Sequence, residues 1–134
     1  MLEINTHAFL FADRIITENN GKKGLIGVFT CFNFPGFPIQ APPWFVFVAM
    51  DNIPEGKHGF TINIVRNENK QVVFSASGEF STRGPSDGAE LSFPIPPIQF
   101  PGDGKYLVSF VMGSREISQR FLQVNLQQAK GAQK

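Results

Sequence analysis

Apolar and polar residues alternate along most of the second half of the chain, with the two-residue period of a β-strand that buries one face. Across residues 25–34 and 44–50, by contrast, apolar residues occupy both alternate positions. A strand that is apolar on both faces has a second surface to cover, by a partner subunit, a ligand or a folded-over loop. The N-terminal strands are therefore the first place to look for function.

The short alternating segments are separated by Gly, Pro and Asn, and they predict an all-β fold. We expect an antiparallel β-sandwich of about eight strands with immunoglobulin-like Greek-key or jelly-roll connections. Residues 1–126 are predicted to form a single domain, followed by a polar, disordered tail at 127–134. The strands are predicted at residues 7–16, 25–34, 44–50, 60–67, 72–80, 89–95, 106–112 and 115–124.

The first hairpin register depends on the turn that joins its strands. Asn20-Gly21 is a residue pair favoured in two-residue type I′ turns, because both positions need a positive φ. A turn of this length places Phe11 opposite Thr30. That register assigns a face to every residue of both strands, since neighbouring side chains point to opposite sides.

The later hairpins follow from matching their apolar faces. A three-residue turn at 68–70 sets Ile64 opposite Phe74, and the hairpin at 113–114 requires a bulge near Phe121. Alternation then assigns these core residues to the fourth to seventh strands: Phe60, Ile62, Ile64, Val72, Phe74, Ala76, Leu91, Phe93, Ile95, Tyr106, Val108 and Phe110.

Composition excludes several classes of partner. The net charge is +1 and the longest basic run is Lys22-Lys23, too little for sequence-independent nucleic-acid binding or for a polybasic membrane anchor. No apolar stretch reaches the roughly 20 residues of a spanning helix, and the N-terminus lacks a secretory signal pattern. One Cys allows no internal disulfide, so we expect a cytoplasmic protein.

The chain offers few groups for catalysis or metal binding. Its two His are far apart in sequence, and Cys31 is expected to be a small buried residue. Asp51, Asp87 and Asp103 fall in loops and are candidate calcium ligands, although single loop Asp residues more often form Asx turns. We therefore expect no metal, no cofactor and no enzymatic activity.

Asp13 is the polar residue on the face of Phe9 and Phe11, where a carboxylate needs a partner. We interpret it as a structural carboxylate that accepts backbone N–H groups or pairs with an Arg or Lys. The alternative is a ligand contact, or an unfamiliar kind of enzyme site, formed by His7, Asp13 and Arg14.

Several motifs in order resemble a family of short bacterial proteins that is known only as a domain of unknown function. They are an Ala-x-x-x-Ala-Asp start at 8–13, Gly-Lys followed by Ile-Gly-Val-Phe at 21–29, Phe-Pro leading through Pro43 into 44–48, and Gly-Lys-Tyr at 104–106. The resemblance extends over about 8–124. It implies a stand-alone bacterial β-sandwich without an assigned activity.

The expected function is a non-enzymatic binding or assembly module that self-associates, as a twofold dimer, through the doubly apolar N-terminal strands. The alternative is a small-molecule or carbohydrate-binding sandwich that uses the loops near Trp44 and Tyr106. The interface candidates are Leu10, Leu25, Phe29, Phe45 and Phe47.

Overall fold

The computed structural model describes residues 3–127, and these residues form strands and their connections. The all-β prediction is thereby confirmed. The strands are β1 (Asn5–Thr17), β2 (Lys23–Phe29), β3 (Cys31–Phe34), β4 (Ile39–Gln40), β5 (Trp44–Asp51), β6 (Gly56–Arg66), β7 (Val72–Thr82), β8 (Ala89–Ile95), β9 (Gln99–Phe100), β10 (Gly104–Met112) and β11 (Arg115–Leu126).

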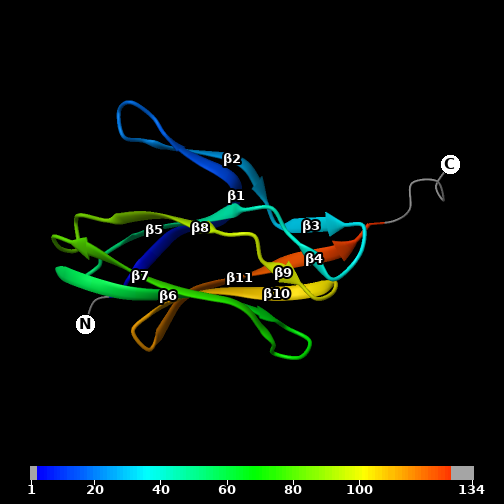
Figure 1. The fold of residues 1–134 in the computed structure, drawn as a ribbon. Helices are drawn as coiled ribbons and strands as arrows, with labels where there is room; N and C mark the ends of the chain where they lie inside the picture. The colour runs from blue at the N-terminus through cyan, green and yellow to red at the C-terminus, as the bar shows by residue number, and fades with distance from the viewer. Residues whose placement is uncertain (1–2, 128–134) are drawn as a thin grey trace.

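Two sheets lie face to face as the layers of a sandwich (Figure 1). One has the order β2-β1-β5-β8, and the other has the order β3-β11-β10-β6-β7. β1 pairs antiparallel with β5 in the first sheet, whereas β3 pairs parallel with β11 in the second. The chain therefore crosses from one sheet to the other between β2 and β3. This is the arrangement of an immunoglobulin-like sandwich, with β5 and β8 in one sheet and β6, β10 and β11 in the other.

The core lies between the sheets, and an aromatic cluster surrounds Trp44, which is 1% exposed. Its indole makes edge contacts with the rings of Phe11, Phe29 and Phe32, at centroid distances of 5.3, 5.5 and 5.8 Å. Such edge-to-face pairs add to the effect of burial alone. The four rings come from β5, β1, β2 and β3, so this cluster holds the base of the N-terminal hairpin against the sandwich.

Tyr106 closes the end of the sandwich where β10 begins. Its side chain is fully buried, and its hydroxyl donates a 2.6 Å hydrogen bond to the carbonyl of Gly102. This bond from a buried Tyr to the backbone just upstream is a recurrent feature of immunoglobulin-like sandwiches. Burial raises the pKa of Tyr106, so the hydroxyl stays protonated and remains a donor.

Arg120 on β11 lies opposite Val108 on β10, whose side chain is in the core. Opposite residues of paired strands point to the same face, so the Arg120 side chain also points between the sheets. β2 accompanies β1 only from Phe11 onward, which leaves the edge of β1 open at Phe9. The Arg120 guanidinium donates a 2.9 Å hydrogen bond to the Phe9 carbonyl and lies 5.9 Å from the centroid of the Phe11 ring. It therefore bridges the open side of the sandwich between β11 and β1.

The predicted β6–β7 register is confirmed, with Ile64 opposite Phe74. Val72 was wrongly assigned to the core: a bulge between Ile64 and Val65 pairs Val65 with Val72 and leaves Val72 59% exposed. The β10–β11 hairpin has the expected bulge, but it lies between Phe110 and Val111. The remaining predicted core residues of these strands are buried or half-buried.

The register predicted for the first hairpin is wrong by one residue, since Phe11 lies opposite Phe29. The amide of Gly21 donates to the carbonyl of Glu18, and Gly21 has a φ of 88°. The turn is therefore a three-residue loop with glycine in the left-handed position, rather than a two-residue turn.

Two Pro-rich connections that share the sequence Pro-Ile-Gln pair with each other. β4 and β9 run antiparallel, with Ile39 opposite Phe100, and the amide of Ala41 donates to the carbonyl of Ile98. They form a small two-stranded sheet, separate from the two main sheets.

Cys31 is exposed, which corrects the expectation of a buried thiol. The prediction followed from the slipped first hairpin; Cys31 instead pairs with Gln123 on β11. The predicted tail lies outside the described residues, apart from Gln127, whose amide donates to the Phe34 carbonyl. Residues 3–127 contain no helix long and apolar enough to cross a membrane.

Candidate functional site

The outer face of the four-stranded sheet is apolar at its centre. Leu10 on β1 pairs with Phe47 on β5, and Ala12 pairs with Phe45, all pointing away from the core that their neighbours line. Phe47 is only 7% exposed although it lies on this outer face. A second layer must therefore shield it, because an outer face in contact with water would leave a Phe exposed.

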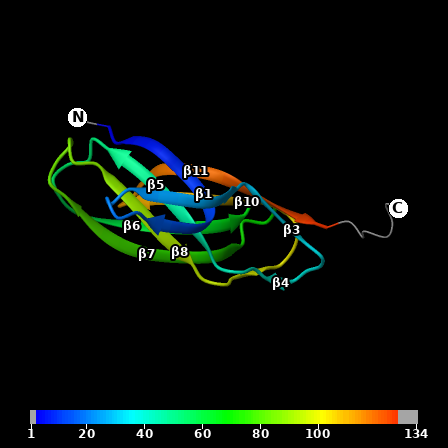
Figure 2. The same ribbon diagram turned by 90° about the horizontal axis from the view of Figure 1, so that it is seen from above.

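The hairpin formed by the end of β1 and by β2 lies on the same outer side (Figure 1). It rises from the sandwich on the outer side of the sheet (Figure 1), and seen from above it crosses β5 and β8 (Figure 2). Register places Val28 beside Ala12 and Ile26 beside Arg14, on the face that continues the outer face of the sheet.

Three β-branched residues on this side of the hairpin remain exposed: Ile16 by 44%, Ile26 by 39% and Val28 by 53%. Leu10, Phe45 and Phe47 lie on the same side of the sheet, and these six residues are here named the hairpin face. Exposed apolar residues that lie next to one another indicate an interaction site more strongly than isolated ones do.

Gly27 allows the hairpin to leave the sheet. It has a φ of 70°, a conformation that favours glycine, and the Asp13 carboxylate occupies the place where a Cβ on residue 27 would lie. Asp13 itself is exposed and makes no hydrogen bond or ion pair within residues 3–127, contrary to the partner we expected. The reason is that the hairpin diverges here, so residue 13 no longer faces the core.

The structure places the predicted interface candidates on two different faces. Leu10, Phe45 and Phe47 lie on the hairpin face, but Leu25 and Phe29 point to the opposite side, and Phe29 packs against Trp44 in the core. The one-residue error in the first hairpin exchanged the faces of β2. Ile26 and Val28 take the places that sequence reasoning gave to Leu25 and Phe29.

His7 lies at the other end of the same outer face, at a β-bulge between Thr6 and Ala8. Its Nε2 is 2.9 Å from Oδ2 of Asp51, and the Asn5 side-chain amide donates to Oδ1 at 3.1 Å. Bulges re-aim a side chain, and this one directs the His7 ring toward the end of β5. Sequence reasoning singled out His7 but not this pairing, which depends on the bulge.

A shallow pocket of about 490 Å³ adjoins this pair, and it has two acidic groups on the β8 side. Asp87 is held by Arg83 through both the backbone amide and the guanidinium, and Glu90 is exposed. The other lining residues are His7, Ala49, Met50, Gly88 and Ala89. This end of the outer face therefore carries mainly negative charge.

The other predicted site residues are not brought together with His7. Asp13 and Arg14 lie at the base of the hairpin, whereas His7 lies near the start of β1. The three loop Asp residues considered for calcium also lack a common site. In the described part of the chain no group of three or more His, Cys, Asp or Glu side chains has the arrangement to hold a metal ion.

Ionisation of Asp51 makes the stability of the protein vary with pH in the acidic range. Hydrogen bonds from His7 and then from Asn5 hold the pKa of Asp51 below its ordinary value of 3.8. The ionised carboxylate therefore stabilises the fold above the unfolded-state pKa, and this contribution is lost as the pH falls through the lower folded-state pKa. We expect Asp51→Asn to lower the melting temperature at pH 7.

The melting-temperature gap between wild type and Asp51→Asn should shrink as the pH is lowered from about 5 to below 3, because the wild-type carboxyl is then protonated too. Calorimetric melting curves at both ends of this range measure it. A gap that stays constant with pH would show that the ionised carboxylate contributes nothing.

Residues 7–125 match the family of unknown function DUF6941. The chain belongs to this family. The resemblance noted from the sequence is thus confirmed, and the DUF6941 match covers both the hairpin face and the His7 pocket. No protein of curated function matches the DUF6941 chain significantly.

Solved structures similar to the DUF6941 fold are distant in sequence. The Pseudomonas fluorescens alkylpurine DNA glycosylase AlkC, solved bound to DNA containing an abasic site analog, aligns with 92% of this chain at a TM-score of 0.53 and 9% identity. DesR, a β-glucosidase from Streptomyces venezuelae in complex with D-glucose, aligns with 92% at a TM-score of 0.40 and 10% identity. The chain spans 30% and 15% of those two chains, and the likeness to AlkC shows the fold alone.

Proposed function

We propose that this protein is a non-enzymatic binding or assembly module that self-associates through the hairpin face. The observation that carries the proposal is that exposed Ile16, Ile26 and Val28 on the hairpin share the side of half-buried Leu10 and Phe45 on the sheet. A twofold dimer buries such a surface on both copies at once, because the same patch serves on each side.

The curvature of the hairpin supports this mode of association. The hairpin bends back over the sheet (Figure 1), and its register puts Ile26 and Val28 on the side that continues the outer face of the sheet. In the proposed dimer the hairpin of each copy lies on the hairpin face of the other. The β-branched residues then pack against Leu10 and Phe45 of the second copy.

The hairpin tip and the pocket beside His7 carry opposite charges. The hairpin tip carries Lys22 and Lys23 beside Glu18, whereas the pocket beside His7 carries Glu90 and the Arg83-paired Asp87. A twofold arrangement brings the basic tip of one copy to the acidic end of the other. Complementary charges of this kind set the orientation of an interface more than its strength.

For the alternative, a ligand site that uses the loops near Trp44 and Tyr106, the two side chains themselves are 1% and 0% exposed. Neither aromatic ring presents a face to a ligand. We further propose a cytoplasmic location, since a lone exposed thiol suits a reducing compartment.

Val28→Glu tests the proposal. A carboxylate in the centre of the hairpin face has to be desolvated on association, so we expect the dissociation constant to rise at least about tenfold, equivalent to about 1.4 kcal/mol. Light scattering behind a sizing column, across a dilution series, measures the assembly mass. Leu126→Glu is the matched control, because Leu126 is 54% exposed against 53% for Val28 and lies at the far end of β11.

The proposal predicts a lower mass at each concentration for Val28→Glu and an unchanged mass for Leu126→Glu. If the two variants and the wild type share one mass throughout the series, the hairpin face does not mediate self-association.

A further inference from the structure

We propose that β7 is a second self-association surface, at which two copies join their five-stranded sheets edge to edge through residues 74–80. This interface lies on the other sheet from the hairpin face, so the inference goes beyond the proposed function and does not depend on it.

β7 is a long edge strand that lacks the usual features that prevent pairing with another strand. It is the last strand of its sheet, pairs with β6 alone among the described residues, spans 11 residues and contains no Pro. Seen from above, it runs along the margin of the molecule (Figure 2). An edge of this kind presents backbone N–H and C=O groups that can pair with another strand.

The other edge strands are less suited to pairing. β8 contains Pro94, which lacks an amide hydrogen, and β3 is only 4 residues long. β2 is interrupted by Gly27 in its left-handed conformation. These are the usual means by which sheets avoid edge-to-edge contacts, and β7 lacks them.

The sequence of β7 is nearly the same in both directions. Residues 74–80 read Phe-Ser-Ala-Ser-Gly-Glu-Phe, with Ser77 at the centre. Two antiparallel copies related by a twofold axis at Ser77 place Phe74 opposite the second copy's Phe80. Ala76 then lies opposite Gly78, large residues meet large ones, and small residues meet small ones.

The charges and exposure of β7 fit the same register. Glu79, its one charged residue, lies opposite Ser75 of the second copy, so no like charges face each other. Phe74 and Phe80 are only half-buried in the single chain, since no further strand follows β7 on this side. Strand addition covers the exposed parts of both rings.

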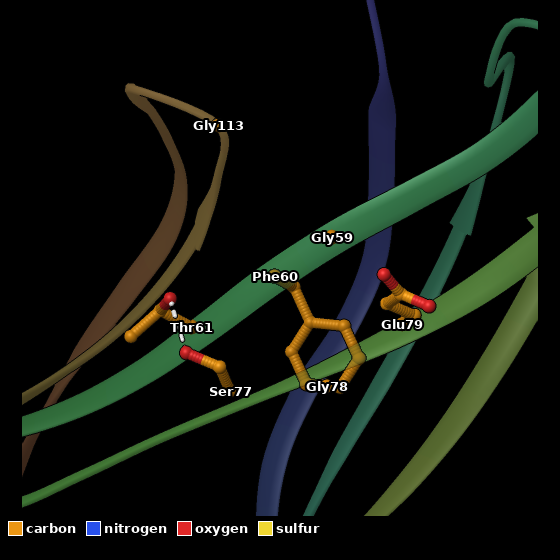
Figure 3. A pocket seen from close by; sticks show the side chains of 7 residues that line it. All are labelled: Gly59, Phe60, Thr61, Ser77, Gly78, Glu79 and Gly113. Atoms are coloured by element: carbon orange, nitrogen blue, oxygen red, sulfur yellow. Dashed lines mark hydrogen bonds between the residues drawn. The ribbon is translucent and has the colours of Figure 1, made fainter.

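The surface around the proposed axis is an open, shallow pocket of about 510 Å³, so nothing in it blocks a second strand (Figure 3). The Phe60 ring fills the space above Gly78 on the inner side, and on the outer side the hydroxyls of Thr61 and Ser77 are hydrogen-bonded to each other at 2.9 Å (Figure 3). No long side chain projects from residues 76–78 to keep a second copy away.

Substitutions at Ser77 test the inference because this residue faces its own copy across the axis. Ser77→Glu places two carboxylates opposite each other, and Ser77→Lys places two ammonium groups there, so each alone should abolish the β7 contact. An equimolar mixture of the two variants pairs Glu with Lys and should restore it. Gln119→Glu, on the exposed outer face of β11 in the same sheet, is the control for added charge.

Light scattering on the wild type and these variants separates this inference from the proposed function. Two different twofold contacts build assemblies larger than a dimer. We therefore expect dimers from Ser77→Glu and from Val28→Glu, a monomer from the double variant, and recovery of the larger species on mixing the Ser77 variants. If Ser77→Glu leaves the wild-type mass unchanged, the β7 contact is refuted. If Val28→Glu has no effect while Ser77→Glu yields monomers, the hairpin proposal fails and the β7 contact stands.

Discussion

Trp44→Ala is expected to lower the free energy of unfolding by about 3–5 kcal/mol, the range for truncating a large buried aromatic side chain. Trp44 is 1% exposed, and three Phe rings from β1, β2 and β3 pack against its indole. Removing the indole leaves a cavity where these strands meet, and the surrounding rings can fill it only in part. Urea unfolding followed by circular dichroism measures the loss.

Trp44→Phe should cost less than half as much as Trp44→Ala. The indole Nε1 is buried and has no hydrogen-bond partner within residues 3–127, which itself costs about 1–3 kcal/mol. Phe keeps most of the ring and removes this unsatisfied donor. Equal losses for the two variants would mean that the indole nitrogen contributes to stability after all.

Arg120→Ala is the second large effect that we expect. The variant loses the hydrogen bond to the Phe9 carbonyl, which is then left without a partner at a cost of about 1–3 kcal/mol. It also loses the contact over the Phe11 ring and the packing of the aliphatic stem. We therefore expect a total loss at the upper end of that range or above it.

Two further variants separate the contributions at Arg120. Arg120→Met keeps an unbranched apolar stem, so it should lose mainly the hydrogen bond and the ring contact. Arg83→Met is the control, because Arg83 is 91% exposed in its pair with Asp87 and exposed ion pairs contribute about 0–1 kcal/mol. Equal urea midpoints for Arg120→Ala and Arg83→Met would contradict a structural role for Arg120.

Local patterns were sufficient to predict the β6–β7 hairpin but not the first one. In β6 and β7 only one loop length aligned Ile64 with Phe74, so the apolar faces determined the register. β1 and β2 are apolar on both faces, and either register leaves apolar residues opposite each other. The choice then depended on the turn, where the conformation of Gly21 decided for a three-residue loop.

The apolar composition of the N-terminal strands was enough to predict part of the candidate site. The parts that depend on which residues pair across strands could not be predicted. The excess of apolar residues in the N-terminal strands indicated a second apolar face, and Leu10, Phe45 and Phe47 were placed on the side of the sheet where the structure has them. Ile26 and Val28 were missed because the one-residue slip exchanged the faces of β2. The His7–Asp51 pair was missed because a bulge at His7, invisible in alternation, directs the imidazole toward β5.

The contacts of Trp44 give the protein a built-in optical reporter. The chain has one tryptophan, so its intrinsic emission comes from a single place, the junction where the hairpin leaves the sandwich. Phe29 and Phe32, which flank the hairpin on its return, form part of the wall around the indole. Detachment of the hairpin would admit water and shift the emission to longer wavelengths, while the circular dichroism of the remaining strands stayed nearly constant. Fluorescence and circular dichroism recorded together therefore distinguish a local opening from global unfolding, without any added label.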